Sequence, residues 1–441
     1  MPDPLLDELT AWLRIPSISS GDGDPADLAR AAAWVCERVE DAGGTASIVP
    51  TAGNPLAIGE LRSSRADAPT VLIYGHYDVQ SITPLEDWLS DPFEPEIRDG
   101  RLYARGASDD KGNFLPLLHV ACRLAKAGEL PVHVRVVVEG EEEIGGHHVL
   151  DWFAEDERGA DCAIVFDSGM EDERTPALTV GVRGIVHLAV DVRTAPRNLH
   201  SGLYGGAALN AAHALQIALA PLLPGSDGLL RDELRAGRLD PTPDERTSWA
   251  RLAPGPEVLA EVGASPLSQG ALDDFYGRNW AEPSFDINGI AAGDAANPRT
   301  ILLGSARAIL SLRLAPGQDA EQIRDATEQL IRDATPAGAE LTITRYGLGR
   351  PAVFDPALPA MRLAREAIGR AAGAEPVLVR SGGSIPILAG FADRGVPTVL
   401  SGFSLSADDI HAPNESYRLE SLRLGERAAE ELYPALARLK D

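Results

Sequence analysis

The sequence predicts an α/β protein in which helices flank a mainly parallel central sheet and a smaller α+β domain is inserted. Apolar strand-like runs alternate with helical patterns before residue 183 and after residue 347, which is typical of a parallel sheet. Between those positions, strands that alternate apolar and polar residues indicate a half-exposed antiparallel sheet. A length of 441 residues suits two or three domains. We therefore expect one domain from residues 1–182 and 348–441, and an inserted domain at 183–347.

The outer parts of the chain supply the elements of the larger domain. Helical periodicity covers residues 4–14 and 25–43, and the Gly43-Gly44 pair ends the second run. The run "TVLIYGH" is almost entirely apolar, as expected for a strand buried on both faces. A helix is expected at about 113–127, with further strands in "PVHVRVVVEG" and "DCAIVFDSG". Near the end, "MRLAREAIGRAAG", "VPTVLSG" and "LRLGERAAEELYPALARL" predict a helix, a strand and a closing helix.

The middle of the chain has a different pattern. "VRGIVHLAVDVRT", "SARAILSLRLAPG" and "AELTITRYG" predict strands, and helices are expected at 207–220 and 319–334. This order is typical of a small two-layer domain of the ferredoxin-like kind. Residues 224–300 are rich in Pro, Gly and Asp and give no prediction.

Composition excludes several classes of partner. With 40 basic and 66 acidic residues, the net charge of −26 disfavours nucleic acid and anionic membrane surfaces. Three widely spaced cysteines form no CxxC pair and are expected to be reduced core residues. The N-terminal segment resembles an amphipathic helix rather than a signal peptide, and no apolar run reaches the ~18 residues that a membrane span needs. We expect a cytoplasmic protein.

Polar residues gather where the predicted strands end. In an open α/β sheet, ligands bind beyond the carboxyl ends of the strands. The residues at those ends are His76, Asp78, Asp109, Asp110, Glu142, Glu143, Asp167 and His411. Each alone is more often a helix cap, a solvated acid or a hydrogen-bonded His. Their coincidence at successive strand ends favours a site for divalent metal, which imidazoles and carboxylates bind together.

Several motifs resemble one known family. "GHYDVQ", "ARGASDDKG", "EGEEEIGG", "NLHSGLYGG", "SGGSIP" and a late His occur in the order found in the co-catalytic di-metal peptidases. That family includes carnosine-type dipeptidases, glutamate carboxypeptidases, aminoacylases and succinyl-diaminopimelate desuccinylases. The resemblance covers almost the whole chain and is nearest to the cytosolic dipeptidase branch. It implies a zinc-peptidase-like catalytic domain, at 1–182 and 348–441, with a lid or dimerisation domain inserted at 183–347.

The resemblance implies two divalent metal ions per subunit, zinc being expected and manganese or cobalt being possible for such ligands. His76 and Asp167 would bind one ion, Glu143 and His411 would bind the other, and Asp109 would bridge both. The peptide bond after Asp109 would be cis.

Two further acids take roles from the resemblance. Asp78 would hold the imidazole of His76 in orientation, since residues two apart share one side of an extended chain. Glu142 would be the general base that takes a proton from a water bridging the metals and delivers it to the leaving amine.

Substrate recognition is implied for the middle of the chain. His200 would reach across the interface of a homodimer to stabilise the oxyanion, and Thr300 and Arg313 would recognise the substrate's carboxylate. The "SGGSIP" loop would line the pocket with Ser381, Gly383 and Ser384.

Three functions stay open at this point. Carnosine-type dipeptidases carry an acid, which meets the substrate's free amine, at the position of Ser381. Hydrolysis of dipeptides or short peptides is therefore the first hypothesis, and deacylation of N-acyl amino acids by the same site is the alternative. A non-catalytic binding homologue is disfavoured, because every expected ligand and the base are present.

Overall fold

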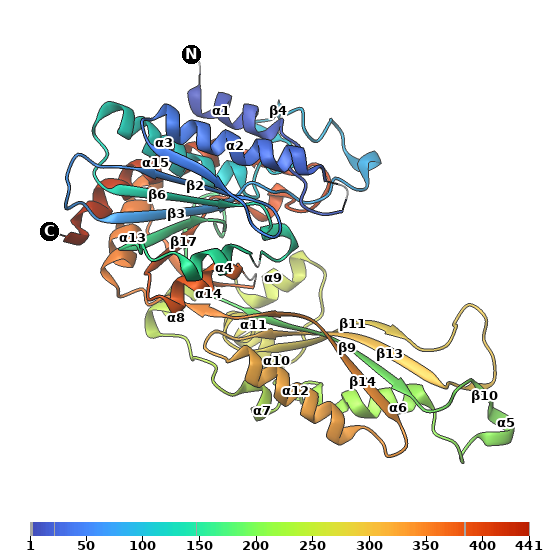
Figure 1. The fold of residues 1–441 in the computed structure, drawn as a ribbon. Coiled ribbons are helices and arrows are strands. Elements are labelled where there is room, and N and C mark those ends of the chain that lie inside the picture. Colours follow the sequence, from blue (N-terminus) through green and yellow to red (C-terminus); the bar gives the residue numbers. More distant parts are fainter. Residues whose placement is uncertain (1–2, 22, 147, 383–384, 441) are drawn as a thin grey trace. The chain divides into compact units, whose positions relative to one another are not determined.

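The computed structural model describes residues 3–21, 23–146, 148–382 and 385–440. Contacts between Cα atoms divide the chain into two compact units (Figure 1). The first unit comprises Met1–Val180, Phe354–Val379 and Ile385–Asp441, and the second comprises Gly181–Val353 and Arg380–Ser384. Both units are thus assembled from separate stretches of the chain.

The first unit is built on a largely parallel sheet. Its strands follow the order β1-β2-β6-β3-β7-β17-β8. β6, β3, β7 and β17 are mutually parallel, while β1, β2 and β8 pair antiparallel with their neighbours. The bounds are β1 Thr45–Val49, β2 Leu56–Leu61, β3 Thr70–His76, β6 His133–Glu139, β7 Cys162–Phe166, β8 Ala177–Val182 and β17 Thr398–Ser401. β16 (Val377–Ser381) also pairs with β8. β15 (Ala352–Val353), which belongs to the second unit, pairs with Gly181 and Val182 at the end of β8 that lies in the same unit. The predicted parallel sheet is confirmed.

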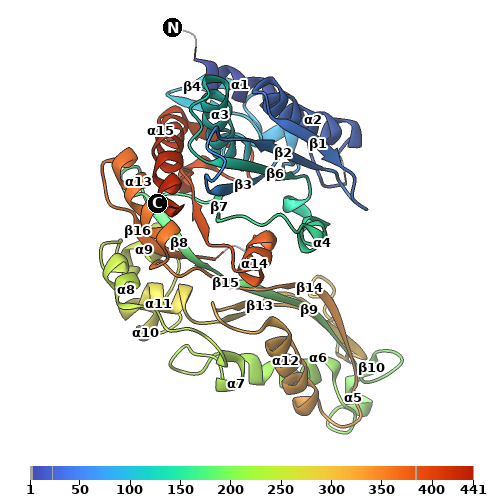
Figure 2. The same ribbon diagram turned by 60° about the vertical axis from the view of Figure 1, so that its left-hand side comes forward.

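Helices cover both faces of this sheet (Figure 2). The helices of the unit are α1 Pro4–Leu13, α2 Pro25–Asp41, α3 Lys111–Ala127, α4 His148–Glu155, α13 Pro359–Ala372, α14 Pro386–Asp393 and α15 Leu419–Leu436. Tyr74 of β3 packs edge-on against Phe391 of α14. Its neighbour Gly75 faces α3, where a Cβ atom would come within 2.5 Å of the Phe114 ring. The absence of a side chain at Gly75 therefore brings the start of α3 close to the end of β3.

Local sequence signals explain where these helices begin and end. The Asp3 and Asp24 side chains accept hydrogen bonds from backbone N–H groups at the starts of α1 and α2, and Pro follows each Asp. α3 ends at Gly128, which has a φ of 70° and supplies the left-handed cap. Outside the main sheet lie a small sheet of β4 Glu96–Arg98, β5 Arg101–Tyr103 and β18 Ser416–Arg418, and the 3-10 turns η1 Leu85–Asp87, η2 Glu142–Ile144, η4 Ser406–Asp408 and η5 Ala437–Lys440.

The second unit is a two-layer α+β structure. Its antiparallel sheet has the order β11-β13-β9-β14, with bounds β9 Gly184–Arg193, β11 Ser284–Ala291, β13 Ser305–Leu314 and β14 Glu340–Gly349. Alternate residues of β13 are buried, and they share one apolar core with α6 (Ala211–Leu219) and α12 (Ala320–Ala334). This arrangement agrees with the predicted ferredoxin-like insertion.

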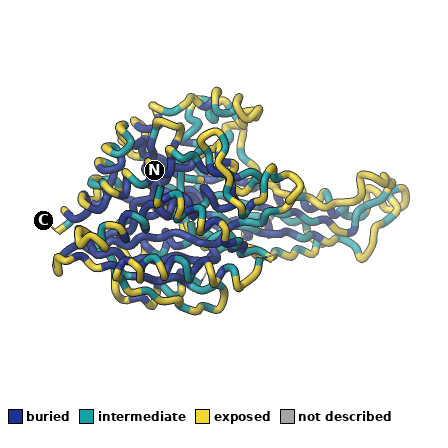
Figure 3. The backbone as a smooth tube through the Cα atoms, turned by 90° about the horizontal axis from the view of Figure 1, so that it is seen from above, coloured by how far each residue is buried: buried dark blue, intermediate teal, exposed yellow. Residues whose placement is uncertain are grey.

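Smaller elements complete the second unit. β10 (Leu199–His200) and β12 (Ile301–Leu302) form a two-stranded ribbon. Residues 220–280 fold into short helices, namely η3 Ala220–Leu222, α7 Asp232–Arg235, α8 Pro243–Trp249, α9 Gly255–Glu261, α10 Gln269–Asp273 and α11 Phe275–Trp280; α5 Ser201–Tyr204 follows β10. Figure 3 colours the backbone by burial; β6 and β7 are buried along their whole length, whereas β14 is mostly exposed. Among the described residues, no helix is both long and apolar enough to cross a membrane.

Candidate metal centre

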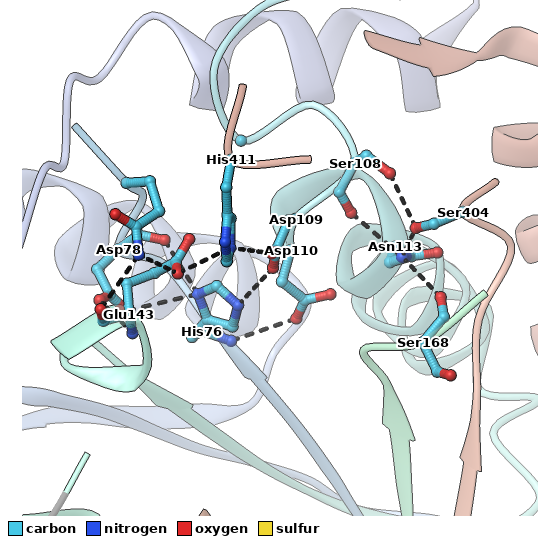
Figure 4. Close-up of polar contacts among 12 residues, drawn as sticks. His76, Asp78, Ser108, Asp109, Asp110, Asn113, Glu143, Ser168, Ser404 and His411 are labelled. Carbon is cyan, nitrogen blue, oxygen red and sulfur yellow. Dashed lines mark hydrogen bonds and ion pairs between the residues drawn. The ribbon is translucent and has the colours of Figure 1, made fainter. Parts of the chain in front are cut away.

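The predicted metal ligands of the first unit lie at one edge of its sheet. His76 is the last residue of β3, Asp167 follows β7 directly, and Glu143 lies in the turn η2 after β6. Asp109 precedes α3, and His411 follows η4 in the loop after β17. The carboxyl ends of three parallel strands meet here, which is why residues far apart in the sequence converge (Figure 4).

These residues form two groups that share one carboxylate. Potential ligand atoms of His76, Asp109 and Asp167 all lie within 4.8 Å of one another, as do those of Asp109, Glu143 and His411. Asp109 faces both imidazoles: its Oδ1 lies 2.9 Å from His76 Nε2 and its Oδ2 lies 3.0 Å from His411 Nε2. His411 Nε2 also lies 3.1 Å from Glu143 Oε2. The peptide bond between Asp109 and Asp110 is cis, as the resemblance predicted.

Asp78 lies beside His76 and is fully buried. Its Oδ1 is 3.5 Å from His76 Nδ1, whereas its own backbone oxygen is nearer to that nitrogen, at 3.0 Å. The other carboxylate oxygen accepts a hydrogen bond from the backbone N–H of Glu143 at 3.2 Å. Asp78 therefore contacts the histidine through both backbone and side chain, and it also ties down the turn that bears Glu143.

The turn that bears Glu142 and Glu143 is held from two sides. Gly145, with a φ of 100°, closes η2 by donating its N–H to the Glu142 carbonyl. The Glu141 carboxylate accepts a hydrogen bond from the Asn54 N–H at 3.1 Å and contacts His148 Nδ1 at 2.6 Å. Glu142 and Glu143 are consequently neighbours on a fixed turn.

The electrostatics of the site show crowding of negative charge. Burial, reinforced by Asp109, raises the pKa of Asp167 to about 7, and burial raises the pKa of Glu142 well above its usual value. Burial also opposes ionisation of Asp109, yet its hydrogen bonds with His411 and His76 lower its pKa. Hydrogen bonds with Asp109 and Glu143 raise the pKa of His411 to about 10. Nitrogen and oxygen donors with such an excess of buried carboxylate fit two divalent cations.

A cavity of about 310 Å³ opens beside Asp109 and Asp167 in the same unit. Its other lining residues are mostly small or polar: Ser108, Asn113, Ser168, Gly169, Met170, Ser404, Leu405, Ser406 and Ile410. The buried Asn113 amide braces this wall by donating to the Ser108 and Ser168 carbonyls and to Ser404 Oγ (Figure 4). Three loops that carry or flank predicted ligands are thereby joined.

The remaining predicted site residues belong to the second unit. His200 and Thr300 are exposed neighbours at the two-stranded ribbon, where His200 pairs with Ile301. His200 Nδ1 accepts a hydrogen bond from the Gly202 N–H at 3.0 Å.

Arg313 lies near the end of β13 and has a second arginine beside it. Its backbone oxygen accepts a hydrogen bond from the Arg183 guanidinium at 3.4 Å, and Arg183 also donates to Ser284 Oγ at 2.8 Å. Burial and the charge of Arg313 lower the pKa of Arg183 to about 10. The Ser381 carbonyl accepts from the Arg183 N–H. Gly383 and Ser384 lie outside the described residues.

Sequence reasoning did not single out Arg183, Asn113 or Glu415. Glu415 is a buried acid four residues after His411, and it accepts hydrogen bonds from the loop that bears Asp109. The only sequence signal for it is an acid in "HAPNE", and its partners lie more than three hundred positions away.

Comparison with known proteins places this geometry in a family. The sequence profile of Peptidase family M20/M25/M40 matches residues 72–433. This chain belongs to that peptidase family. The match runs through both units and includes every predicted site residue.

Two relatives within the M20 peptidases span most of the chain. The cysteinylglycine-S-conjugate dipeptidase of Corynebacterium striatum is 30% identical over 397 residues, which cover 88% of this chain and 85% of the relative. The human Beta-Ala-His dipeptidase is 28% identical, over 82% of this chain and 73% of the relative.

Solved structures share the M20 peptidase fold. An M20 family metallo-carboxypeptidase from Sulfolobus solfataricus superposes with a TM-score of 0.86 at 24% identity, covering 99% of this chain and all of the other. The di-peptidase Dug1p of Saccharomyces cerevisiae superposes with a TM-score of 0.78, covering 99% of this chain and 96% of the other. The predicted fold class is confirmed.

Proposed function

We propose that this protein is a metal-dependent peptidase that hydrolyses the amide bond of dipeptides or short peptides. The observation that carries the proposal is the pair of potential ligand groups sharing Asp109, with Glu142 beside Glu143 on one turn. Two relatives are named for dipeptidase activity, which supports dipeptides as the substrate class. A protein that only bound peptides would need neither two groups of metal ligands nor a general base beside them.

The first ion would be held by His76, Asp109 and Asp167, and the second by Asp109, Glu143 and His411. Zinc is the ion we expect, and manganese or cobalt would suit the same donors. Two divalent cations would polarise the scissile carbonyl and lower the pKa of the attacking water. Asp78 would keep the imidazole of His76 in the orientation that presents Nε2 to this site.

Glu142 would act as the general base. It stands next to a ligand without belonging to either group of ligands, and burial raises its pKa, which makes its carboxylate a stronger base. A carboxylate that readily holds a proton can take one from water and release it to the leaving amine. The neighbouring Glu143 would bind metal, so the adjacent acids would divide two tasks.

The cavity beside Asp109 would receive a part of the substrate next to the scissile bond, because it opens directly off the shared carboxylate. Arg313 and Thr300 would recognise the substrate's carboxylate, and the neighbouring Arg183 would add positive charge for this purpose. Ser381, Gly383 and Ser384 would line the substrate pocket.

Residues 1–182 and 348–441 would form the catalytic domain, and residues 183–347 would form a lid that also mediates homodimerisation. His200 would act across the dimer interface on the oxyanion of the partner subunit's site. Its exposed position on a short ribbon suits such a reach. We further propose a cytoplasmic location, with neither nucleic acid nor membrane as a partner.

Hydrolysis of Ala-Ala and of N-acetyl-Ala-Ala, with protein reconstituted in zinc or manganese, tests this function. We expect alanine to be released from the uncapped dipeptide, and Glu142→Gln provides the inactive control. Release of acetate from the capped substrate, without release of alanine from the uncapped one, would make the protein a deacylase and direct attention to Ser381. Two bound ions with no hydrolysis of either substrate would overturn the proposal.

A further inference from the structure

Glu415 is a buried carboxylate that binds the loop bearing Asp109, the residue common to both groups of candidate ligands. The side chains of Glu415 and its partner Arg105 are each only 1% exposed. Glu415 Oε2 accepts hydrogen bonds from Arg105 Nη1 and the Gly106 N–H, each at 2.9 Å. Its Oε1 accepts from the backbone N–H groups of Ser108 at 2.9 Å and Asp109 at 3.1 Å. Four donors thus meet the four acceptor sites of one carboxylate.

The backbone around Glu415 fixes this contact further. The Glu415 carbonyl accepts a hydrogen bond from the Ala104 N–H, and Ser416 begins β18, which pairs with β5 just before that loop. Glu415 follows His411 by four residues, so the same segment carries a ligand of the second group. Residues 411–415 therefore carry His411 itself and also hold Asp109 in place through Glu415.

Arg105 and Asn414 extend these contacts to the loop before β4. Arg105 also donates to the Ser81 carbonyl at 3.0 Å, and its guanidinium lies 5.1 Å from the centre of the Trp88 ring. Asn414 Oδ1 accepts a hydrogen bond from the Leu89 N–H at 2.8 Å. Three loops that come together around the ligands thus share Arg105, Asn414 and Glu415 as anchors.

We propose that Glu415 is a positioning residue that holds the backbone of Asp109, and with it the shared carboxylate, in register with His411. The inference rests on the proposed di-metal site. Metal sites depend on ligand positions to within a few tenths of an ångström, and residues that orient ligands alter metal affinity by about 10- to 100-fold. A shift in the N–H of Asp109 would move the ligand itself.

The alternative role for Glu415 is a purely structural one, as half of a buried ion pair. Asp156 provides a matched control in the same unit. Its side chain is 5% exposed, it pairs with Arg135, and it accepts a hydrogen bond from Arg158 at 2.6 Å. None of these three residues is a candidate metal ligand. Loss of Asp156 should therefore disturb stability without altering the metal site.

Glu415→Gln is the decisive variant, because it keeps the size of the side chain but replaces one acceptor oxygen with an NH2 donor. That NH2 would face N–H donors of the loop. We expect at least one of the two ions to bind ten-fold or more weakly in chelator competition, and the visible spectrum of the cobalt-substituted protein to change. Asp156→Asn should lower the thermal midpoint while leaving both metal affinities and the cobalt spectrum as in the wild type.

Wild-type affinities and an unchanged cobalt spectrum in Glu415→Gln would overturn the positioning role. Should that variant fail to fold, Glu415→Asp decides the question with the same measurements. Its carboxylate is one methylene shorter and cannot reach all four donors, so we expect weakened metal binding, and unchanged affinities would again overturn the inference. Failure of the wild type to bind two ions is a different result, which would refute the proposed function itself.

Discussion

The two units differ in what surrounds their predicted functional residues. In the first unit, strands such as β6 and β7 are buried along their whole length, and the candidate ligands emerge at their ends. In the second unit, β13 alternates buried and accessible residues, and His200 and Thr300 are exposed. Carboxylates gathered in a buried place need a compensating charge, whereas exposed residues do not. The first region should therefore depend on metal for its local order, and the second should not.

Metal removal is expected to have the largest effect of the changes considered. If both units lost hydrogen-exchange protection equally, the proposed difference between them would be wrong. A chelator should abolish dipeptide hydrolysis and reduce hydrogen-exchange protection in the loops around Asp109 and His411. Protection in β9 and β13 should stay unchanged, and added zinc should restore both activity and loop protection. Equal loss of protection in both units would show that the metal is a general stabiliser.

Replacement of the proposed base should separate chemistry from metal binding within the first unit. Glu142→Gln should retain both ions and lower kcat by about 10²- to 10⁴-fold, because proton transfer is lost while the ligands remain. Metal analysis and steady-state kinetics check this expectation. Glu155→Gln, at the exposed end of α4, is the matched control and should be fully active. Normal turnover in Glu142→Gln would exclude this residue as the base.

The exposed histidine of the second unit should affect turnover without affecting metal. His200→Ala should lower kcat by about 10²-fold, as for loss of an oxyanion donor, with a change in stability within about 0.5 kcal/mol. Mixed with Glu142→Gln protein, it should regain part of its activity, since one hybrid site would be intact. His213→Ala, at an exposed position of α6, is the control. A mixture that regains no activity would argue against action of His200 across a dimer interface.

The smallest expected effect concerns pH and a buried carboxylate outside the metal centre. Burial opposes ionisation of Asp156, but hydrogen bonds from Arg158 and Arg135 lower its pKa below the usual value. A lowered pKa in the folded state stabilises the protein above the unfolded pKa of about 3.9, and this contribution is lost as pH falls through the folded value. In urea unfolding, the wild type should have a higher free energy of unfolding than Asp156→Asn, and this difference should be lost only below about pH 4. A constant difference down to pH 2 would contradict this assignment.

The sequence predicted the outline of both units because their hydrophobic patterns differ in period. "TVLIYGH" indicated a strand buried on both faces, and β3 is that strand. The helix expected at 207–220 is shorter, because Asn210 caps α6 and residues before it form the ribbon and α5. Residues 224–300 gave no prediction, yet "TPDE" carries the Thr242 and Glu245 capping box that begins α8.

The candidate ligands were predictable because polar residues at the ends of apolar strands stand out in the sequence. Glu415 and Arg183 were not, because their roles depend on backbone groups that only the folded chain brings near. Asp78 shows an intermediate case. Its spacing from His76 predicted the contact, but the nearer partner of the ring nitrogen is the Asp78 backbone oxygen, which no side-chain pattern could reveal.

The separation of the ligands along the chain has a consequence for biosynthesis. His411 meets Asp109 across 302 positions of sequence, and Glu415 lies later still. A ribosome must therefore complete nearly all of both units before the site can assemble, so a nascent or prematurely terminated chain cannot be an active hydrolase. Peptide hydrolysis can begin only after the segment that carries His411 and Glu415 has been synthesised.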